Sequence, residues 1–328
     1  MQRRAIVRFL GGALLAWPSV LRAQSTRLPV VVLISARDAE TSVDLNAEFR
    51  KGLRQTGFAE GKDVVIEYHW LDGHYERLPT IIDDIVRRGV DVIATPGNSP
   101  GALAAKAATE TIPIVFGVGD DPVALGLVKS LAQPRTNATG INFFASEINT
   151  KRLGLMHELL PKAVRLAVLV NPANRYTTEA TSNALKEAAP GLGLELLFFN
   201  ASTVAEIDAA FATISNSNAD ALFVSPDAFF VNRSKQFAEL AIRNRLPASA
   251  FASENAEAGL LMSYGTNLAD MFRQIGVYCG SILKGAKPAE LPVLQSTKFE
   301  FVINLQAARL LGVDIPPTML ARADAVIE

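Results

Sequence analysis

The sequence of 328 residues has one cysteine, three histidines and no excess of either charge, with 32 Lys and Arg against 33 Asp and Glu. A lone cysteine cannot form an internal disulfide, and Cys279 lies far from the amino-terminal region where a lipidated cysteine would stand. It falls among apolar residues at helical spacing between Leu268 and Ile282. We therefore interpret it as a small buried hydrophobe and not as a reactive thiol.

The first 23 residues contain four arginines and no acidic residue, and they enclose an apolar run at residues 9–16. This run is much shorter than the roughly 20 residues that span a bilayer, and Pro18 follows it closely. The pattern is typical of a secretory signal cleaved near Ala23, so we expect a periplasmic protein. Arg3 and Arg4 fit the twin-arginine route, with the Sec route as the alternative. Without those four arginines, 28 basic and 33 acidic residues remain, and the net charge of −5 argues against a nucleic-acid partner.

The length exceeds that of one usual hydrophobic core and predicts two domains. In the first half, apolar runs at residues 30–34, 64–68, 90–94 and 114–116 alternate with segments of helical periodicity, which is typical of a parallel sheet covered by helices. The same order returns in the second half, with expected strands at residues 166–170, 194–199, 221–224 and 248–251. We therefore predict an α/β fold of two related, doubly wound, Rossmann-like lobes.

The segment at residues 114–144 links the two halves. Its strand leads into a turn rich in Gly and Asp, after which we predict a short helix, and the chain leaves through a polar run at residues 134–140. Two later extended runs, residues 291–295 and 299–303, find a sheet only if the chain crosses between the lobes three times, near Gly140, Ser263 and residues 292–295. The predicted first lobe comprises residues 24–140 and 264–292, and the predicted second lobe comprises residues 141–263 and 293–328.

Residues 97–101, Gly-Asn-Ser-Pro-Gly, match the Gly-x-Ser-x-Gly nucleophile elbow of serine hydrolases. In that elbow the residue after the serine donates its backbone N–H to the oxyanion, and Pro100 has no N–H to donate. His157, the only later histidine, falls in an expected helix and not in a loop. The match therefore does not indicate a hydrolase.

His69, Asp72 and His74 cluster after the second expected strand, but three ligands in one loop without a fourth are a weak metal signal. We interpret them as a polar loop and expect neither a metal nor a cofactor. The adjacent acids Asp120 and Asp121 precede a proline, and neighbouring side chains usually point apart. That pair therefore favours helix capping or ligand contact over acid–base catalysis.

Polar residues follow the carboxyl ends of expected strands in both halves, and aromatic residues lie near them. Ligands of open β/α sheets bind at that edge, where helix amino termini present free N–H groups. We therefore expect the ligand-binding residues to be Ser35, Asn98, Ser99, Asp120, Phe143, Asn171, Tyr176, Ser225, Asp227, Phe229 and Glu254.

Several motifs together carry a resemblance: Arg-Arg-x-x-x-x-x-Leu-Gly-Gly at residues 3–12, Gly-Asp-Asp-Pro-Val-x-x-Gly-Leu-Val-x-Ser-Leu-Ala at 119–132, Asn-x-Thr-Gly at 137–140, Ser-Tyr-Gly at 263–265, Ile-Leu-Lys-Gly-x-Lys-Pro at 282–288, and Phe-x-Phe-Val-Ile-Asn at 299–304. Over almost its whole length the sequence resembles the ABC-transporter substrate-binding proteins of the tryptophan/tyrosine-uptake type. It departs at Arg135 and Thr136, where that family tends to have two glycines, so this hinge is expected to be stiffer. The resemblance implies the type I periplasmic binding protein fold, with a ligand in the cleft between two lobes.

The resemblance, with no convincing catalytic group beside it, predicts a monomeric solute-binding protein that delivers a small molecule to an ABC permease. An enzyme on the same scaffold would need a base in the cleft, for which Asp120 and Asp227 are the candidates; a receptor that feeds a sensor is a further alternative. A repressor-like regulator would need a helix-turn-helix where this chain has a signal peptide.

The polar residues expected at the cleft favour an amino acid or related carboxylate as the ligand. Helix amino termini and Ser or Asn groups would hold the carboxylate, and an acid would pair the amine. Tyr176 or Phe229 would cover the side chain of the ligand.

Overall fold

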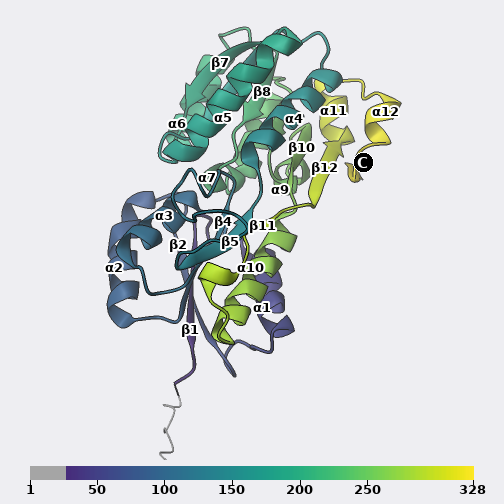
Figure 1. Ribbon diagram of the computed structural model, residues 1–328. Coiled ribbons are helices and arrows are strands. Elements are labelled where there is room, and N and C mark those ends of the chain that lie inside the picture. The colour runs from purple at the N-terminus through teal and green to yellow at the C-terminus, as the bar shows by residue number, and fades with distance from the viewer. Residues whose placement is uncertain (1–26) are drawn as a thin grey trace, which may run out of the picture.

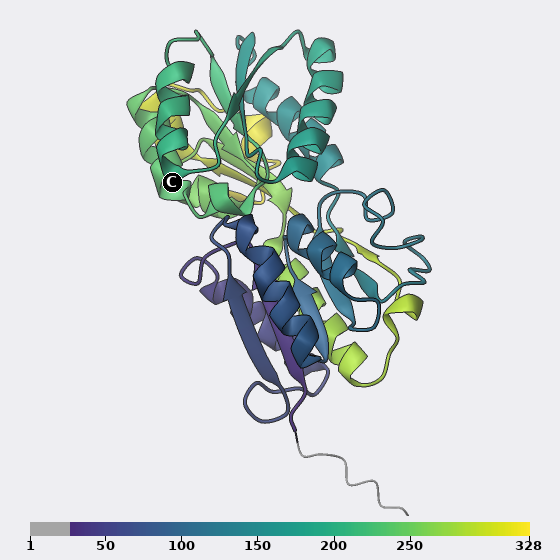
Figure 2. The ribbon, with the colours of Figure 1, turned by 90° about the vertical axis from the view of Figure 1, so that its left-hand side faces the viewer.

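The computed structural model describes residues 27–328, so the signal-peptide and twin-arginine predictions concern residues outside the described part. Two lobes, each built on one sheet with helices on both faces, lie end to end (Figures 1 and 2). This arrangement confirms the predicted α/β class of two doubly wound lobes.

The first lobe has a six-stranded sheet in the order β11-β5-β4-β3-β1-β2, and all of its paired strands are parallel. Its strands read as continuous apolar runs because both faces are buried: Val31 and Leu33 pack toward one face, and Val32 and Ile34 toward the other. The strands are β1 (Val30–Ser35), β2 (Val65–Trp70), β3 (Val92–Thr95), β4 (Ile114–Val118), β5 (Ala138–Asn142) and β11 (Leu294–Gln295).

Two helices pack on each face of this sheet: α1 and α10 on one, α2 and α3 on the other (Figure 1). Asn98 caps α3 by accepting the N–H of Gly101 at 2.9 Å, and Asn267 caps α10 by accepting the N–H of Asp270 at 2.6 Å. The helices are α1 (Val43–Gln55), α2 (Leu78–Arg88), α3 (Ser99–Ala108) and α10 (Leu268–Leu283), with 3₁₀ turns η1 (Tyr75–Arg77) and η3 (Pro288–Glu290).

The second lobe has a seven-stranded sheet in the order β13-β12-β10-β9-β8-β6-β7, in which only the β10–β12 pair is antiparallel. Its strands are β6 (Arg165–Val170), β7 (Glu195–Asn200), β8 (Ala221–Val224), β9 (Ala248–Ala250), β10 (Met262–Thr266), β12 (Phe299–Asn304) and β13 (Ala325–Ile327). Its helices are α4 (Ala145–Leu159), α5 (Arg175–Ala188), α6 (Val204–Ile214), α7 (Ala228–Val231), α8 (Ser234–Arg243), α9 (Ser253–Glu257), α11 (Leu305–Leu311) and α12 (Pro317–Leu320), with the 3₁₀ turn η2 (Ala189–Leu192).

The chain changes sheets between β5 and α4, between β10 and α10, and between β11 and β12. The two late extended runs therefore have the places that three crossings give them, β11 at the edge of the first sheet and β12 beside β10 in the second. Each change of sheet lies a few residues after the predicted crossing, because β5, β10 and β11 extend past the predicted ends of their lobes. We propose lobe boundaries near residues 143, 267 and 297.

The predicted short helix after the Gly/Asp turn is wrong, because residues 122–126 form turns without a helix. Gly126 ends them with a φ of +74°, a left-handed conformation that does not continue a helix. The helices α7, α8 and α9, between residues 228 and 257, are absent from the sequence prediction. Two of these three have five or fewer residues, too few to show a helical period.

Cys279 lies on α10 and is fully buried in the core of the first lobe, where burial raises the pKa of its thiol, so the prediction of a buried hydrophobe is confirmed. Within residues 27–328, no helix has both the length and the apolar character that crossing a bilayer requires.

Candidate functional site

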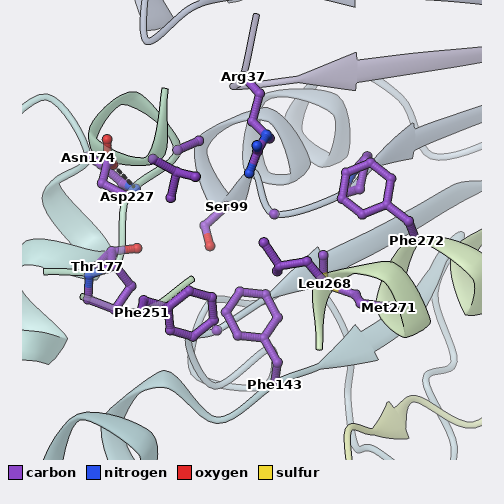
Figure 3. A pocket seen from close by; sticks show the side chains of 16 residues that line it. Arg37, Ser99, Phe143, Asn174, Thr177, Asp227, Phe251, Leu268, Met271 and Phe272 are labelled. Carbon is purple, nitrogen blue, oxygen red and sulfur yellow. Dashed lines mark hydrogen bonds between the residues drawn. The ribbon is translucent and has the colours of Figure 1, made fainter. Parts of the chain in front are cut away.

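A cavity lies between the two lobes, at the carboxyl ends of strands from both sheets (Figure 3). This is the edge at which parallel β/α sheets bind ligands, because the loops and helix amino termini of neighbouring strands meet there. The first lobe contributes Arg37, Pro96, Gly97, Ser99, Gly119, Leu268, Met271 and Phe272; the second contributes Asn174, Thr177, Pro226, Asp227, Ala228, Val231 and Phe251; Phe143 lies on the crossing after β5.

One side of the cavity is apolar. The rings of Phe143 and Phe251 lie with their centroids 5.7 Å apart, and Leu268, Met271 and Phe272 come from the first two turns of α10. These side chains belong to the buried cluster that joins the two lobes. The wall can therefore cover an apolar or aromatic ligand group.

Arg37 brings a positive charge to the cavity from the loop after β1. Its Nη2 donates to the carbonyl of Thr41 at 2.9 Å and to Oε1 of Glu254, on the second lobe, at 3.2 Å. Its side chain is only 7% exposed, and its buried Nε has no partner among the described residues. In Figure 3 its guanidinium points into the space in front of Ser99. This geometry leaves part of a buried guanidinium available to an anionic group of a ligand.

Asp227 caps the short helix α7 and is buried within the second lobe. Its Oδ1 accepts from Asn171 Nδ2 at 2.9 Å and from the N–H of Phe229 at 3.0 Å. Its Oδ2 accepts from Asn174 Nδ2 at 2.9 Å and from the Tyr75 hydroxyl of the first lobe at 3.5 Å. Burial raises the pKa of Asp227, and these hydrogen bonds partly offset that effect.

Asp120 lies directly behind the cavity wall, on the turn after β4. Its Oδ2 accepts from the hydroxyl of Ser99 at 2.8 Å and from the hydroxyl of Thr177, on the second lobe, at 3.3 Å. Its Oδ1 is buried and has no hydrogen-bond partner in the described chain. Burial raises the pKa of this carboxyl, and the two hydroxyl donors lower it in part.

A second set of contacts holds the lobes together beside the cavity. The carboxylate of Asp72 accepts from Arg233 Nη2 at 3.1 and 3.0 Å and from Asn232 Nδ2 at 2.9 Å. The hydroxyl of Thr41 donates to Asn232 Oδ1 at 3.0 Å. Together with the Arg37–Glu254 pair, these contacts show the two lobes closed on each other.

The metal hypothesis for His69, Asp72 and His74 finds no common centre in the structure. His69 lies within β2 and not in the loop, Asp72 is paired with Arg233, and His74 Nδ1 lies 2.8 Å from Glu76. Within residues 27–328, no three His, Cys, Asp or Glu side chains are grouped as they would be around a metal ion.

The structure places the predicted site residues in three groups. Ser99, Phe143 and Asp227 line the cavity. Residues that hydrogen-bond to lining residues form the second group: Ser35, Asp120, Asn171, Phe229 and Glu254. Asn98 and Ser225 are buried and do not line the cavity, and Asn98 caps α3. Tyr176 is 46% exposed and lies outside the cavity wall.

Several residues that line the cavity were not predicted from the sequence. Arg37 follows Ser35 by two positions, and Thr177 follows a helix cap rather than a strand, so a search limited to strand ends passes over both. Phe251, Met271 and Phe272 fit the apolar periodicity of core elements. Only the folded chain distinguishes the core residues that face the cavity.

Comparison with known proteins identifies the family. Residues 30–327 match the model of the ABC transporter substrate binding protein family. The chain is 26% identical over 263 residues, 80% of this chain and 75% of the relative, to a tyrosine-binding protein of Clostridioides difficile.

Two solved structures superpose on nearly the whole chain. One is a conserved domain protein of Vibrio cholerae O1 biovar El Tor, with a TM-score of 0.82 and 28% identity, covering 92% of this chain and 100% of that one. The other is an ABC domain of Streptococcus pneumoniae in complex with L-Trp, with a TM-score of 0.83, 23% identity and the same coverage. The resemblance seen in the sequence is thus confirmed, and the chain belongs to the ABC transporter substrate-binding proteins, extracytoplasmic proteins that deliver a small-molecule ligand to a membrane permease.

Proposed function

We propose that this substrate-binding protein binds a free amino acid with an apolar or aromatic side chain. The observation that carries the proposal is the arrangement of charge in the interlobe cavity. In Figure 3, Arg37, Asp227 and the apolar wall around Phe143 lie on different sides of one space. Asp120 accepts a hydrogen bond from the hydroxyl of Ser99, which also lines this space. A carboxylate, an ammonium group and an apolar side chain would each find a matching surface there.

The groups assigned to the ligand differ from those expected from the sequence. Arg37 replaces the helix amino termini as the partner of the carboxylate, because its guanidinium faces the cavity and is not fully paired. The wall of Phe143, Phe251 and Phe272 takes the role expected of Tyr176 and Phe229. The tyrosine-binding and L-Trp-bound relatives support an aromatic side chain.

Binding would act through the two lobes. The first lobe supplies Arg37 and Ser99, and the second supplies Asp227, Thr177 and Phe251, so a ligand contacts all of them only when the lobes are closed. A ligand stabilises the state for which it has the greater affinity, and here that state is the closed one. The permease then receives a protein whose shape reports that its cavity is occupied.

The first prediction concerns the ligand class. We expect wild-type protein to bind L-tryptophan or L-tyrosine in calorimetric titrations, and to bind the des-amino analogues indole-3-propanoic acid and 3-(4-hydroxyphenyl)propanoic acid about tenfold or more weakly, because a charge-assisted hydrogen bond contributes about 1.5–3 kcal/mol. Des-amino analogues that bind as tightly would overturn the amino-acid proposal in favour of a simple carboxylate. Recovery of the amino acid unchanged after incubation separates this receptor from an enzyme that uses Asp120 or Asp227 as a base.

The second prediction concerns location and assembly. We propose that the protein is exported to the periplasm, cleaved near Ala23 and monomeric. Native mass spectrometry of the periplasmic fraction should give the mass of one chain beginning at Gln24. A dimer mass, or a chain that keeps residues 1–23 in the membrane fraction, would contradict it.

A further inference from the structure

The two buried carboxylates beside the cavity differ in how much of their hydrogen-bonding capacity is used. An ionised carboxylate has about four acceptor positions. Four donors surround Asp227, two on each oxygen, and all four come from the protein. Asp120 has two donors, both on Oδ2, and its Oδ1 lies buried without a partner in the described residues. Asp120 therefore has the free acceptor capacity, and Asp227 does not.

The partners of Asp120 set the polarity of the cavity wall. Ser99 and Thr177 line the cavity, and each donates its only hydroxyl hydrogen to Asp120 Oδ2. A hydroxyl that has given its hydrogen away can only accept, so both oxygens present lone pairs to whatever occupies the cavity. They therefore favour a ligand group that donates hydrogen bonds.

The positions of the two hydroxyls also decide where the carboxylate of the ligand can bind. Ser99 begins α3 and Thr177 lies in the first turn of α5, and helix amino termini attract negative charge. Asp120 already supplies that negative charge between the two helices. The carboxylate of a ligand is thus directed away from this corner and toward Arg37.

We propose that Asp120, Ser99 and Thr177 form the site that recognises the ammonium group of the ligand, while Asp227 serves as a structural cap that holds the loops around it. The inference rests on the proposed amino-acid function and deepens it. Because Ser99 belongs to the first lobe and Thr177 to the second, the site is complete only when the lobes are closed. Recognition of the amine is therefore coupled directly to closure.

The ratio between the affinity for an amino acid and that for its des-amino analogue tests this assignment. We expect Asp120→Asn, which keeps the shape and removes the charge, to weaken binding of L-tryptophan and L-tyrosine about tenfold or more. Binding of indole-3-propanoic acid and 3-(4-hydroxyphenyl)propanoic acid should change by less than about threefold, because these compounds have no amine to lose a partner. Thr177→Val, which removes one hydroxyl at nearly constant volume, should shift the ratio in the same direction by about threefold to tenfold.

Asp227→Asn is the matched control. It places an amide N–H₂ against donors that now face a carboxylate, so it should lower thermal stability and weaken both classes of ligand alike, leaving the ratio unchanged. The assignment is overturned if Asp227→Asn shifts the ratio and Asp120→Asn does not, or if Asp120→Asn weakens both ligand classes equally. Failure of the amino-acid proposal itself appears separately, as wild-type protein that binds the des-amino compounds as tightly as the amino acids.

Discussion

Replacing Arg37 by methionine is expected to weaken the binding of L-tryptophan or L-tyrosine by about 2–5 kcal/mol, which corresponds to a loss of roughly thirtyfold to several thousandfold in affinity. The side chain is 7% exposed, so a ligand carboxylate that binds there is withdrawn from water and depends on the guanidinium for compensation. Methionine keeps most of the apolar stem and removes the charge. Calorimetric titration of the variant gives the loss directly.

Arg37 also pairs with Glu254 across the lobes, and this second role needs its own control. Glu254→Gln removes the carboxylate and keeps the guanidinium. Because the Glu254 side chain is partly exposed, we expect its loss to cost about 0–1 kcal/mol, or less than about fivefold in affinity. Equal losses in the two variants would mean that Arg37 acts only by joining the lobes and does not bind the ligand.

The buried strands of both lobes could be predicted from the sequence because each is marked by apolar residues that are consecutive in the chain. Residues 30–34 and 166–170 are apolar on both faces of the strand, which indicates buried parallel strands whatever the rest of the chain does. The late extended run at residues 299–303 required a return to the second lobe, and β12 lies there beside β10. The predicted short helix failed because proline and acidic residues can begin a turn as well as a helix.

The site could be located from the sequence but not assigned residue by residue. The carboxyl ends of the strands gave Ser99, Asp120 and Asp227, all within one hydrogen bond of the cavity. The same rule also selected Ser225, which is buried away from the cavity wall, because position after a strand does not fix the direction of a side chain. Pairs such as Arg37–Glu254 join residues 217 positions apart, and no local pattern predicts them.

The helices α1 and α10 pack against each other on one face of the first sheet, and a substitution at their contact is expected to have a large effect on stability. These helices approach so closely that a Cβ at Gly276 would overlap the carbonyl oxygen of Phe49, and one at Gly52 would overlap the carbonyl oxygen of Arg273, both inside the 3.0 Å that real Cβ contacts keep. The obstacle is backbone in both cases, so it cannot rotate away as a side chain could. Leu268, Met271 and Phe272 of the cavity wall lie at the start of the same α10 helix.

Gly276→Ala is therefore expected to destabilise the protein by about 3 kcal/mol or more, the upper end of the cost of overpacking, because the two helices must move apart along the core of the first lobe. Urea denaturation followed by circular dichroism measures the change. Gly154→Ala is the matched control: Gly154 lies inside α4 with nothing within 4 Å of an added Cβ, so alanine there should stabilise by about 0.5–1 kcal/mol through helix propensity. Opposite signs for one chemical change would establish that close helix contact, and not a general need for glycine, constrains position 276; a Gly276→Ala variant as stable as wild type would refute the tight packing of α1 on α10.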